Sequence, residues 1–297
     1  MATPEKTRYH YFYIINVKLR KKNSTKDLSP KAYIKLFRDL YNRKIHAESS
    51  PSKHCIIRFM FDNKDNNNNI EYLSGTMAQF TFIQNERWFN LQSLDLDNEF
   101  RVPDGLFPDA VITEYVFVPA AHRFCYRISS DIKITPYSVR KFLDSALNQV
   151  CQDDEIVHVD VESDKSSIEA ILSAKELRKL TIEINYSNFD TGDDYMKFVE
   201  EDLKDSNGNR FKFEASQKPG VSLNVKKSKI LTGALEASVS NGDAEATILD
   251  ENDRVQKIKT SNFPRRESIH GTLSRFNDLV TEKIIGIFRS NGNKTNN

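Results

Sequence analysis

Glycine and cysteine are scarce in this sequence of 297 residues, and each shortage argues against a class of protein. The 10 glycines form neither a G-x-x-x-x-G-K-[ST] nor a G-x-G-x-x-G phosphate loop, which disfavours a P-loop ATPase and a dinucleotide-dependent oxidoreductase. A G-x-S-x-G nucleophile elbow is also missing, so an α/β-hydrolase loses support. Cys55, Cys125 and Cys151 are widely spaced and odd in number, which argues against a disulfide framework and a zinc cluster.

Long hydrophobic runs and paired histidines are missing too. No window approaches the roughly 18 apolar residues that a membrane-spanning helix needs. Arg8 and His10 interrupt the tyrosine-rich start, so no secretory signal with an apolar region is visible. None of the 6 histidines forms the i, i+4 pair of a helical metal site. We therefore expect a cytoplasmic protein with no membrane insertion, no cofactor and no metal, and the sequence favours a non-enzymatic role.

The pattern of hydrophobic residues predicts an α+β fold. Residues 8–19 are aromatic and β-branched, which is typical of a strand. Residues 30–41 and 136–150 carry apolar side chains at i, i+3, i+4 and i+7, so each segment is expected to form an amphipathic helix. Residues 244–249 and 254–260 flank an acidic turn and predict a hairpin.

The length indicates about two domains, each a mainly antiparallel or mixed sheet packed with helices. The polar segment 152–155 is the expected boundary. Residues 1–152 are predicted to form an N-terminal α+β domain with a basic strand and helix, and residues 153–289 a C-terminal α+β domain with the hairpin and a terminal helix. Residues 290–297 contain no apolar side chain and are expected to be a disordered tail.

Basic residues are concentrated near the two ends of the chain, although the formal net charge is only +1. Residues 1–58 contain 14 Lys and Arg against 4 Asp and Glu, residues 59–252 contain 20 against 34, and residues 253–297 contain 9 against 4. Clustered cations raise a local positive potential that attracts polyanions. The alternative is that these cations pair with the acidic middle of the chain or form an ordinary solvated surface.

Nine cations are the candidate nucleic-acid-binding residues. Seven lie at the end of the first predicted strand or on the exposed face of the next helix, where a short loop brings them to one side, and two follow the C-terminal hairpin. They are Lys18, Arg20, Lys21, Lys22, Lys31, Lys35 and Arg38, with Arg265 and Arg266 as a second contact. Such a cluster gives binding with steep salt dependence and little base specificity.

Tyr9, Tyr11 and Tyr13 alternate along the same strand. If exposed, their rings can stack on nucleic-acid bases. Alternating aromatic residues are also the ordinary content of a half-buried strand, where they build the core or an interface.

Arg265 and His270 have the R-x4-H spacing that resembles the signature of the HEPN ribonucleases. The resemblance implies that the arginine stabilises phosphate charge and that the histidine acts as acid or base. The HEPN fold is wholly helical, whereas this segment follows a predicted β-hairpin. A toxin-like, metal-independent nuclease is therefore an alternative, and no catalytic residue is assigned.

Two sets of segments resemble known families. Residues 11–17 (Tyr-Phe-Tyr-Ile-Ile-Asn-Val), residues 75–81 and the Trp88-Phe89-Asn90 segment resemble a bacterial and prophage family of unknown function. The C-terminal order of helix, strand 244–247, acidic turn, strand 255–258 and amphipathic helix is similar to RexA-type phage exclusion proteins. The resemblance implies a cytoplasmic homodimer in antiphage defence that binds DNA, rather than RNA, without marked sequence preference.

The sequence thus leads to three hypotheses. The first is a non-enzymatic, nucleic-acid-binding component of an abortive-infection-like antiphage system, acting as a sensor or as the partner of an effector. The second is the nuclease that uses Arg265 and His270. The third is an interaction scaffold whose acidic middle docks a partner protein of a defence operon.

Overall fold

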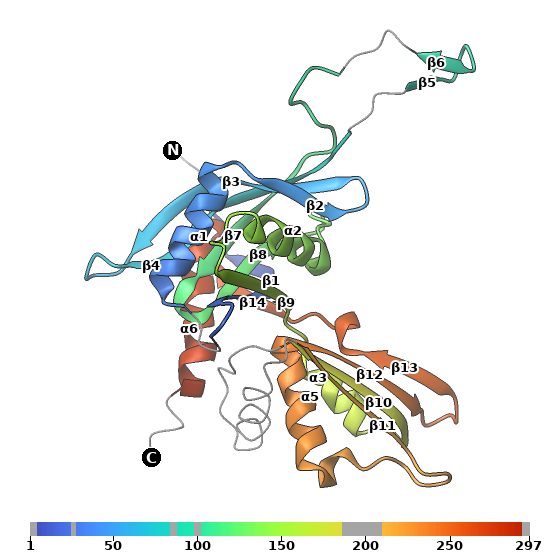
Figure 1. The fold of residues 1–297 in the computed structure, drawn as a ribbon. Helices are drawn as coiled ribbons and strands as arrows, with labels where there is room; N and C mark the ends of the chain where they lie inside the picture. Colours follow the sequence, from blue (N-terminus) through green and yellow to red (C-terminus); the bar gives the residue numbers. More distant parts are fainter. Residues whose placement is uncertain (1–4, 25–27, 84–87, 98–101, 186–209, 293–297) are drawn as a thin grey trace.

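The computed structural model describes residues 5–24, 28–83, 88–97, 102–185 and 210–292. The predicted α+β class is confirmed. Two main antiparallel sheets carry helices on their faces, and a small third sheet stands apart from them (Figure 1).

The larger sheet is built around β1 (Arg8–Lys21). In spatial order its strands are β14 (Arg266–Gly271), β1, β8 (Arg123–Ile128), β7 (Val111–Val118), β4 (Ile70–Thr81), β3 (Lys53–Lys64) and β2 (His46–Ser50). The first half of β1 pairs with β14, and its second half pairs with β9 (Glu155–Val161). β8 pairs with the opposite edge of β1. The length of β1 therefore lets two strands from the C-terminal half of the chain join one edge, one after the other.

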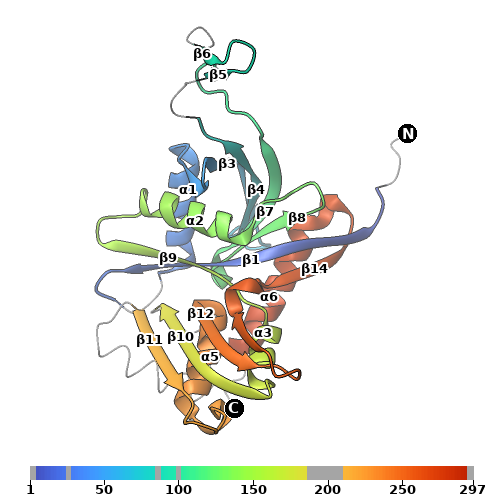
Figure 2. The ribbon, with the colours of Figure 1, turned by 90° about the vertical axis from the view of Figure 1, so that its right-hand side faces the viewer.

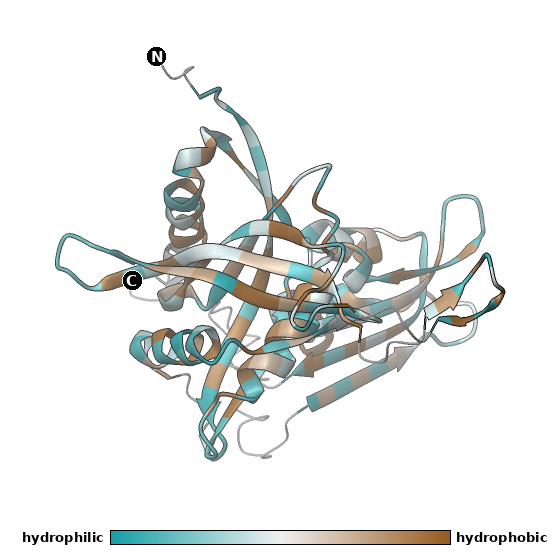
Figure 3. Ribbon diagram, turned by 90° about the horizontal axis from the view of Figure 1, so that it is seen from above, coloured by the Kyte–Doolittle hydropathy of each residue, from teal (hydrophilic) through white to brown (hydrophobic). Residues whose placement is uncertain are grey.

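Helices cover both faces of this sheet. α1 (Pro30–Asn42) and α2 (Pro136–Asn148) pack on the face that carries Ile15 and Val17. α6 (Phe276–Gly292) packs on the opposite face. The helices predicted at residues 30–41 and 136–150 are α1 and α2, and the predicted terminal helix is α6. Figure 3 shows both hydrophobic and hydrophilic residues along the helices. α2 begins where the sequence favours a helix, because the Thr135 hydroxyl accepts the Ser138 N–H and proline occupies the first position.

The smaller sheet has the order β11 (Arg210–Ser216), β10 (Glu176–Asn185), β12 (Gly242–Leu249) and β13 (Val255–Lys259). β12 and β13 form the predicted C-terminal hairpin. One face buries Leu180, Ile182 and Ile184 against α3 (Lys165–Leu172) and α5 (Lys229–Asn241). The sheet lies below β1 and β9, and its strands run side by side in Figure 2.

The remaining elements are short. β5 (Trp88–Asn90) and β6 (Asp95–Asp97) pair only with each other. Single 3-10 turns are η1 (Pro119–Ala121), η2 (Val225–Lys227), η3 (Thr260–Asn262) and η4 (Leu273–Arg275). Within the described ranges, no helix combines the length and the hydrophobicity required to cross a bilayer.

The two sheets do not divide the chain at residue 152. β9, β14 and α6 follow the expected boundary, yet β9 and β14 are strands of the larger sheet and α6 packs on it. The reason is physical: β14 and β9 complete the open edge of β1, and α6 covers apolar residues of β1, β7 and β8 that otherwise face water. α6 also continues to Gly292, beyond the expected start of the tail at residue 290, and residues 293–297 lie outside the described part.

Gly75 provides a test of this sheet. A Cβ atom at Gly75 would fall on the carbonyl oxygen of Phe59 in the neighbouring strand β3. We expect Gly75→Ala to lower the free energy of unfolding by about 1–3 kcal/mol, as overpacking does, in urea denaturation. Gly286→Ala in α6 is the control, because no atom lies within 4 Å of its added Cβ and alanine favours a helix by up to about 1 kcal/mol. Equal stability of the two variants would contradict the strand pairing.

Candidate functional site

Lys18 and Arg20 do not face solvent. Ile15, Val17 and Leu19 point into the core under α1 and α2, so the alternation of the strand turns Asn16, Lys18 and Arg20 to the opposite face. There Lys18 is 2% exposed and its ammonium donates to the Asn241 side chain, while Arg20 is 5% exposed and contacts His158. The sequence placed these two side chains on an accessible surface, whereas this face of β1 is covered by the region around the smaller sheet, so phosphate contacts by Lys18 and Arg20 gain no support from the structure.

Lys21 and Lys22 lie at the end of β1. The Lys21 ammonium is 2.8 Å from Asp154 and 3.2 Å from Glu155. The hydrogen bond that Lys21 donates to Asp154 raises the pKa of Lys21 and lowers the pKa of Asp154. Lys22 is exposed. Lys21 thus follows the alternative drawn from the sequence, in which the basic residues form ion pairs with acidic residues from the middle of the chain.

The three cations of α1 are exposed, and two of them form ion pairs with acidic side chains. Lys31, Lys35 and Arg38 lie on the outer face of the helix, as predicted. Lys35 is 4.0 Å from Asp39, and Arg38 forms an ion pair with Asp62 of β3. The seven N-terminal cations thus fall into a buried pair, a strand end and a helix face, and the structure does not bring them together as one surface.

A buried charged network lies where the two sheets meet. Glu162, which follows β9, is completely buried and forms ion pairs with Arg123 of β8 and with Arg265. The Arg123 guanidinium also donates to the side chain of Asn16 at 2.8 Å, and Asn16 donates to the carbonyl of Ser240 at 2.9 Å. The network therefore connects the centre of the larger sheet with the C-terminal end of α5. It was not predicted, because no sequence pattern marks Glu162 as the partner of two distant arginines.

The structure separates the two predicted C-terminal cations. Arg265 is mostly buried and bridges Glu162 and Glu267. Arg266 is exposed, and its guanidinium lies 4.0 Å above the centre of the Tyr11 ring. Successive strand residues point to opposite faces, so Arg265 is on the α6 face and Arg266 on the other.

The same alternation places Arg265 and His270 on opposite faces of β14. Arg265 lies with Glu267 on the α6 side, whereas the His270 ring lies 4.8 Å from the Tyr9 ring on the other side. Residues an odd number of positions apart on a strand point to opposite faces, so a separation of five holds these two side chains apart. The R-x4-H match therefore does not form a joint arginine and histidine site here.

An exposed aromatic surface does form on β1 and β14. Tyr9 and Tyr11 are 64% and 39% exposed. Strand pairing sets Tyr9 opposite His270, Tyr11 opposite Ser268 and Tyr13 opposite Arg266, and opposite residues of an antiparallel pair share a face. We call Tyr9, Tyr11, Arg266 and His270 the tyrosine strip.

The tyrosine strip has no carboxylate of its own strands. β1 contains no acidic residue, and the one acidic residue of β14, Glu267, lies on the other face and pairs with Arg265 and Lys283. The sequence pattern indicated the tyrosines and Arg266 as candidate nucleic-acid contacts but did not indicate that His270 lies beside them. The alternation of Arg266, Ser268 and His270 is a usable signal, but only the register between β1 and β14 shows that it meets the tyrosines.

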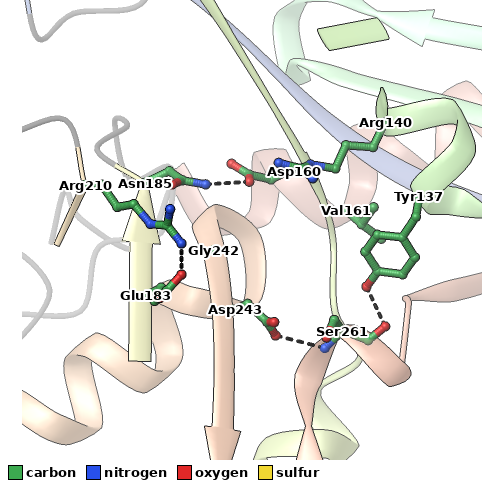
Figure 4. A pocket seen from close by; sticks show the side chains of 10 residues that line it. All are labelled: Tyr137, Arg140, Asp160, Val161, Glu183, Asn185, Arg210, Gly242, Asp243 and Ser261. Atoms are coloured by element: carbon green, nitrogen blue, oxygen red, sulfur yellow. Dashed lines mark hydrogen bonds and ion pairs between the residues drawn. The ribbon is translucent and has the colours of Figure 1, made fainter. Parts of the chain in front are cut away.

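A polar cavity of about 240 Å³ lies between α2, β9 and the smaller sheet (Figure 4). Its charged side chains already have protein partners: Arg210 pairs with Glu183, the Asn185 amide donates to Asp160 at 2.8 Å, and Asp243 accepts the Ser261 N–H at 2.9 Å. Burial raises the pKa of Asp160, and burial with nearby Asp243 raises the pKa of Tyr137 to about 12. The Asn185–Asp160 contact joins the two sheets, the other two lie within the smaller-sheet region, and we assign no ligand to the cavity.

The described part of the chain offers little support for a metal-binding site or a reactive thiol. No group of three or more His, Cys, Asp or Glu residues is arranged there to hold a metal ion. Cys55 and Cys125 are buried, Cys151 is half-buried, and all three are free thiols. Burial raises the pKa of all three thiols, which disfavours the reactive thiolate form.

Comparison with known families places the chain in one family. A family model described as Domain of unknown function (DUF4747) matches residues 8–286, nearly the whole chain, so the chain belongs to this family. No curated protein matches the chain significantly.

The Glu162 network generates a stability prediction. Glu162→Gln leaves Arg123 buried without its ionic partner, and breaking a buried pair typically costs about 3–5 kcal/mol. We expect a loss of that size in chemical denaturation. Asp154→Asn, which removes the exposed partner of Lys21, should change stability little, because solvent screens that pair. A smaller effect for Glu162→Gln than for Asp154→Asn would refute the network.

His158 generates a pH prediction. Burial, with Arg20 and Lys18 nearby, lowers the pKa of His158 to about 4, whereas the unfolded chain has a histidine pKa of about 6.5. Between these two values the unfolded state binds a proton that the native state does not, so stability falls as the pH falls. By this linkage the loss reaches about 3 kcal/mol at the acid end.

His158→Gln should therefore gain stability relative to the wild type as the pH is lowered from 6.5 to 4, measured by urea denaturation at several pH values. His270→Gln changes an exposed histidine and serves as the control. Parallel pH profiles for wild type and His158→Gln would show that the native state does not exclude the proton.

Proposed function

We propose that this member of the DUF4747 family binds single-stranded nucleic acid, with little sequence preference, on the tyrosine strip. The observation that supports the proposal is the exposure of two tyrosine rings on one face of β1 beside an arginine and a histidine. The proposal keeps the nucleic-acid-binding function expected from the sequence but moves it from the strand end and α1 to the β1 and β14 surface.

Base stacking is the first contribution to binding. Tyr9 and Tyr11 are two residues apart on one face of a strand, so their rings are separated by about 7 Å along it. Each ring can accept one base, and stacking on an aromatic side chain contributes about 1–3 kcal/mol per base without reading its identity. Bases are available for such contacts when they are unpaired, so single strands fit the strip better than duplexes.

The cations of the strip are the second contribution. The Arg266 guanidinium already lies 4.0 Å above the centre of the Tyr11 ring, where it can contact a stacked base or a phosphate. His270 adds a further hydrogen-bonding group beside Tyr9. The absence of a carboxylate among the strip-facing residues of β1 and β14 means that no acidic group of these strands repels a phosphate backbone there.

The biological setting is a separate part of the proposal. Antiphage defence, a cytoplasmic location, a preference for DNA over RNA and a partner protein from a defence operon rest on the resemblance to RexA-type proteins and on no contact in the structure. Efficiency of phage plating on cells with and without the protein tests this part, and equal plating across a phage panel would remove it.

Fluorescence anisotropy with labelled single-stranded DNA and RNA tests the strip. We expect the Tyr9→Ala, Tyr11→Ala double variant to weaken binding at least about tenfold, because two stacking contacts are lost, while the corresponding phenylalanine variant retains the affinity. Lys31→Ala with Lys35→Ala on α1 is the matched control and should change the affinity less than about twofold.

The salt dependence separates the strip from the cluster predicted by sequence. For single strands, log K falls with log salt with a slope near −0.7 per neutralised phosphate. One or two cations on the strip therefore predict a slope of about −1, whereas seven predict about −5. Absence of binding at low salt, or a stronger effect of the α1 variant than of the tyrosine variant, would overturn the proposal.

A further inference from the structure

The hairpin formed by β5 and β6 exposes several large apolar side chains to solvent. Leu91 and Leu94 are 82% and 72% exposed, and Phe89 and Leu96 are also exposed. The two strands pair only with each other and stand clear of the sheets and helices (Figure 1). An isolated two-stranded hairpin is marginally stable at best, and a cluster of exposed apolar side chains marks an interaction site.

A second apolar surface lies on β3 and β7. Phe59 and Phe61 of β3 are exposed, as is Ile112 of β7. Strand pairing sets Phe59 opposite Thr76, Phe61 opposite Ser74 and Ala78 opposite Ile112, so all these residues share one face of the larger sheet. We call Phe59, Phe61 and Ile112 the β3 patch.

The β3 patch extends a face that is buried elsewhere. On the same face of β4, Tyr72 is covered by α6 and donates a hydrogen bond to Asp278. α6 covers the region around β1, β7 and β8 and leaves the β3 patch exposed. The patch is therefore continuous with a packed face of the sheet.

The hairpin of one molecule does not cover its own β3 patch. The hairpin is inserted between Thr81 at the end of β4 and Val111 at the start of β7. Phe59 and Phe61 pair with β4 five and seven residues before that end, which is about 17–23 Å along the strand. Both surfaces accordingly remain exposed within one chain.

The charges of the two surfaces are complementary. The hairpin carries Asp95 and Asp97 next to its leucines. The β3 patch is flanked by Arg58, whose guanidinium lies 4.4 Å from the centre of the Phe59 ring, and by Lys64 at the end of β3. The one carboxylate that strand pairing sets beside Phe59 on this face, Glu114 opposite Thr76, is already paired with Arg127 of β8. When the hairpin docks on the β3 patch, the carboxylates beside its leucines meet the cations beside the phenylalanines. Such complementary charges favour one docking orientation.

We propose that two copies of this chain exchange their β5 and β6 hairpins, so that the hairpin of each copy packs on the β3 patch of the other. A two-fold axis makes both contacts identical and closes the assembly as a dimer. The inference is independent of nucleic-acid binding, because neither surface includes the tyrosine strip.

Sedimentation of the full chain over a concentration series tests the dimer. The wild type is expected to dimerise. Leu91→Glu with Leu94→Glu, the hairpin variant, and Phe59→Glu with Phe61→Glu, the patch variant, should each raise the dimer dissociation constant at least about tenfold, as loss of buried anchors does. Val221→Glu with Ile230→Glu removes exposed apolar side chains of the smaller-sheet region and should leave the dimer intact.

Mixing the two variants gives the sharpest result. The hairpin variant keeps an intact patch and the patch variant keeps an intact hairpin, so a heterodimer of the two retains one of the two contacts. We expect the mixture to dimerise more tightly than either variant alone, with circular dichroism confirming that each is folded.

Three outcomes would overturn the proposal: a monomeric wild type, a dimer unaffected by either variant, or a mixture no tighter than the separate variants, which would indicate that hairpins meet hairpins or patches meet patches. A Tyr9→Ala, Tyr11→Ala variant should dimerise normally, so failure of nucleic-acid binding and failure of dimerisation are read separately.

Discussion

The arrangement of the two sheets depends on the ion pairs of the buried Glu162 carboxylate. A charge that is completely buried is costly unless opposite charges meet it, and here Arg123 and Arg265 meet it from two sides. Arg123 belongs to β8, in the middle of the larger sheet, whereas Arg265 directly precedes β14. Pairing these groups requires the C-terminal part of the chain to return to the larger sheet. That return brings β14 beside β1 and α6 over the opposite face.

The predictions from sequence were correct where local patterns decide the structure. The β1 strand, the α1 and α2 helices and the β12 and β13 hairpin all follow from periodicity and turn residues. The sheet order did not follow, because β1 pairs with β9 and β14 across about 140 and 260 residues of sequence and single-sequence patterns carry no register between distant strands. For the same reason the polar segment 152–155 interrupts the apolar pattern along the chain without marking a boundary between the two sheets.

The candidate site shows the same limit at the level of single side chains. The strand period predicts that Lys18 and Arg20 share a face, but it does not say whether water or protein covers that face. The structure buries it. The period also predicts that Tyr9 and Tyr11 share a face, and in this case the face remains exposed. Arg266 and His270 join them only through the pairing of β1 with β14, a contact that no spacing in the sequence reveals.

Folding pairs part of the unevenly distributed charge. Lys21 forms ion pairs with Asp154 and Glu155, Arg38 with Asp62, and Arg265 with Glu162, so these basic residues from the two ends of the chain are matched by acidic residues between them. A cation that already has a carboxylate partner releases few counterions when a phosphate approaches. On our proposal, nucleic-acid affinity at the tyrosine strip therefore comes mainly from stacking on the two exposed rings, with Arg266 orienting the strand. A surface that works in this way recognises unpaired bases of any sequence, since every base offers a flat face to an aromatic ring.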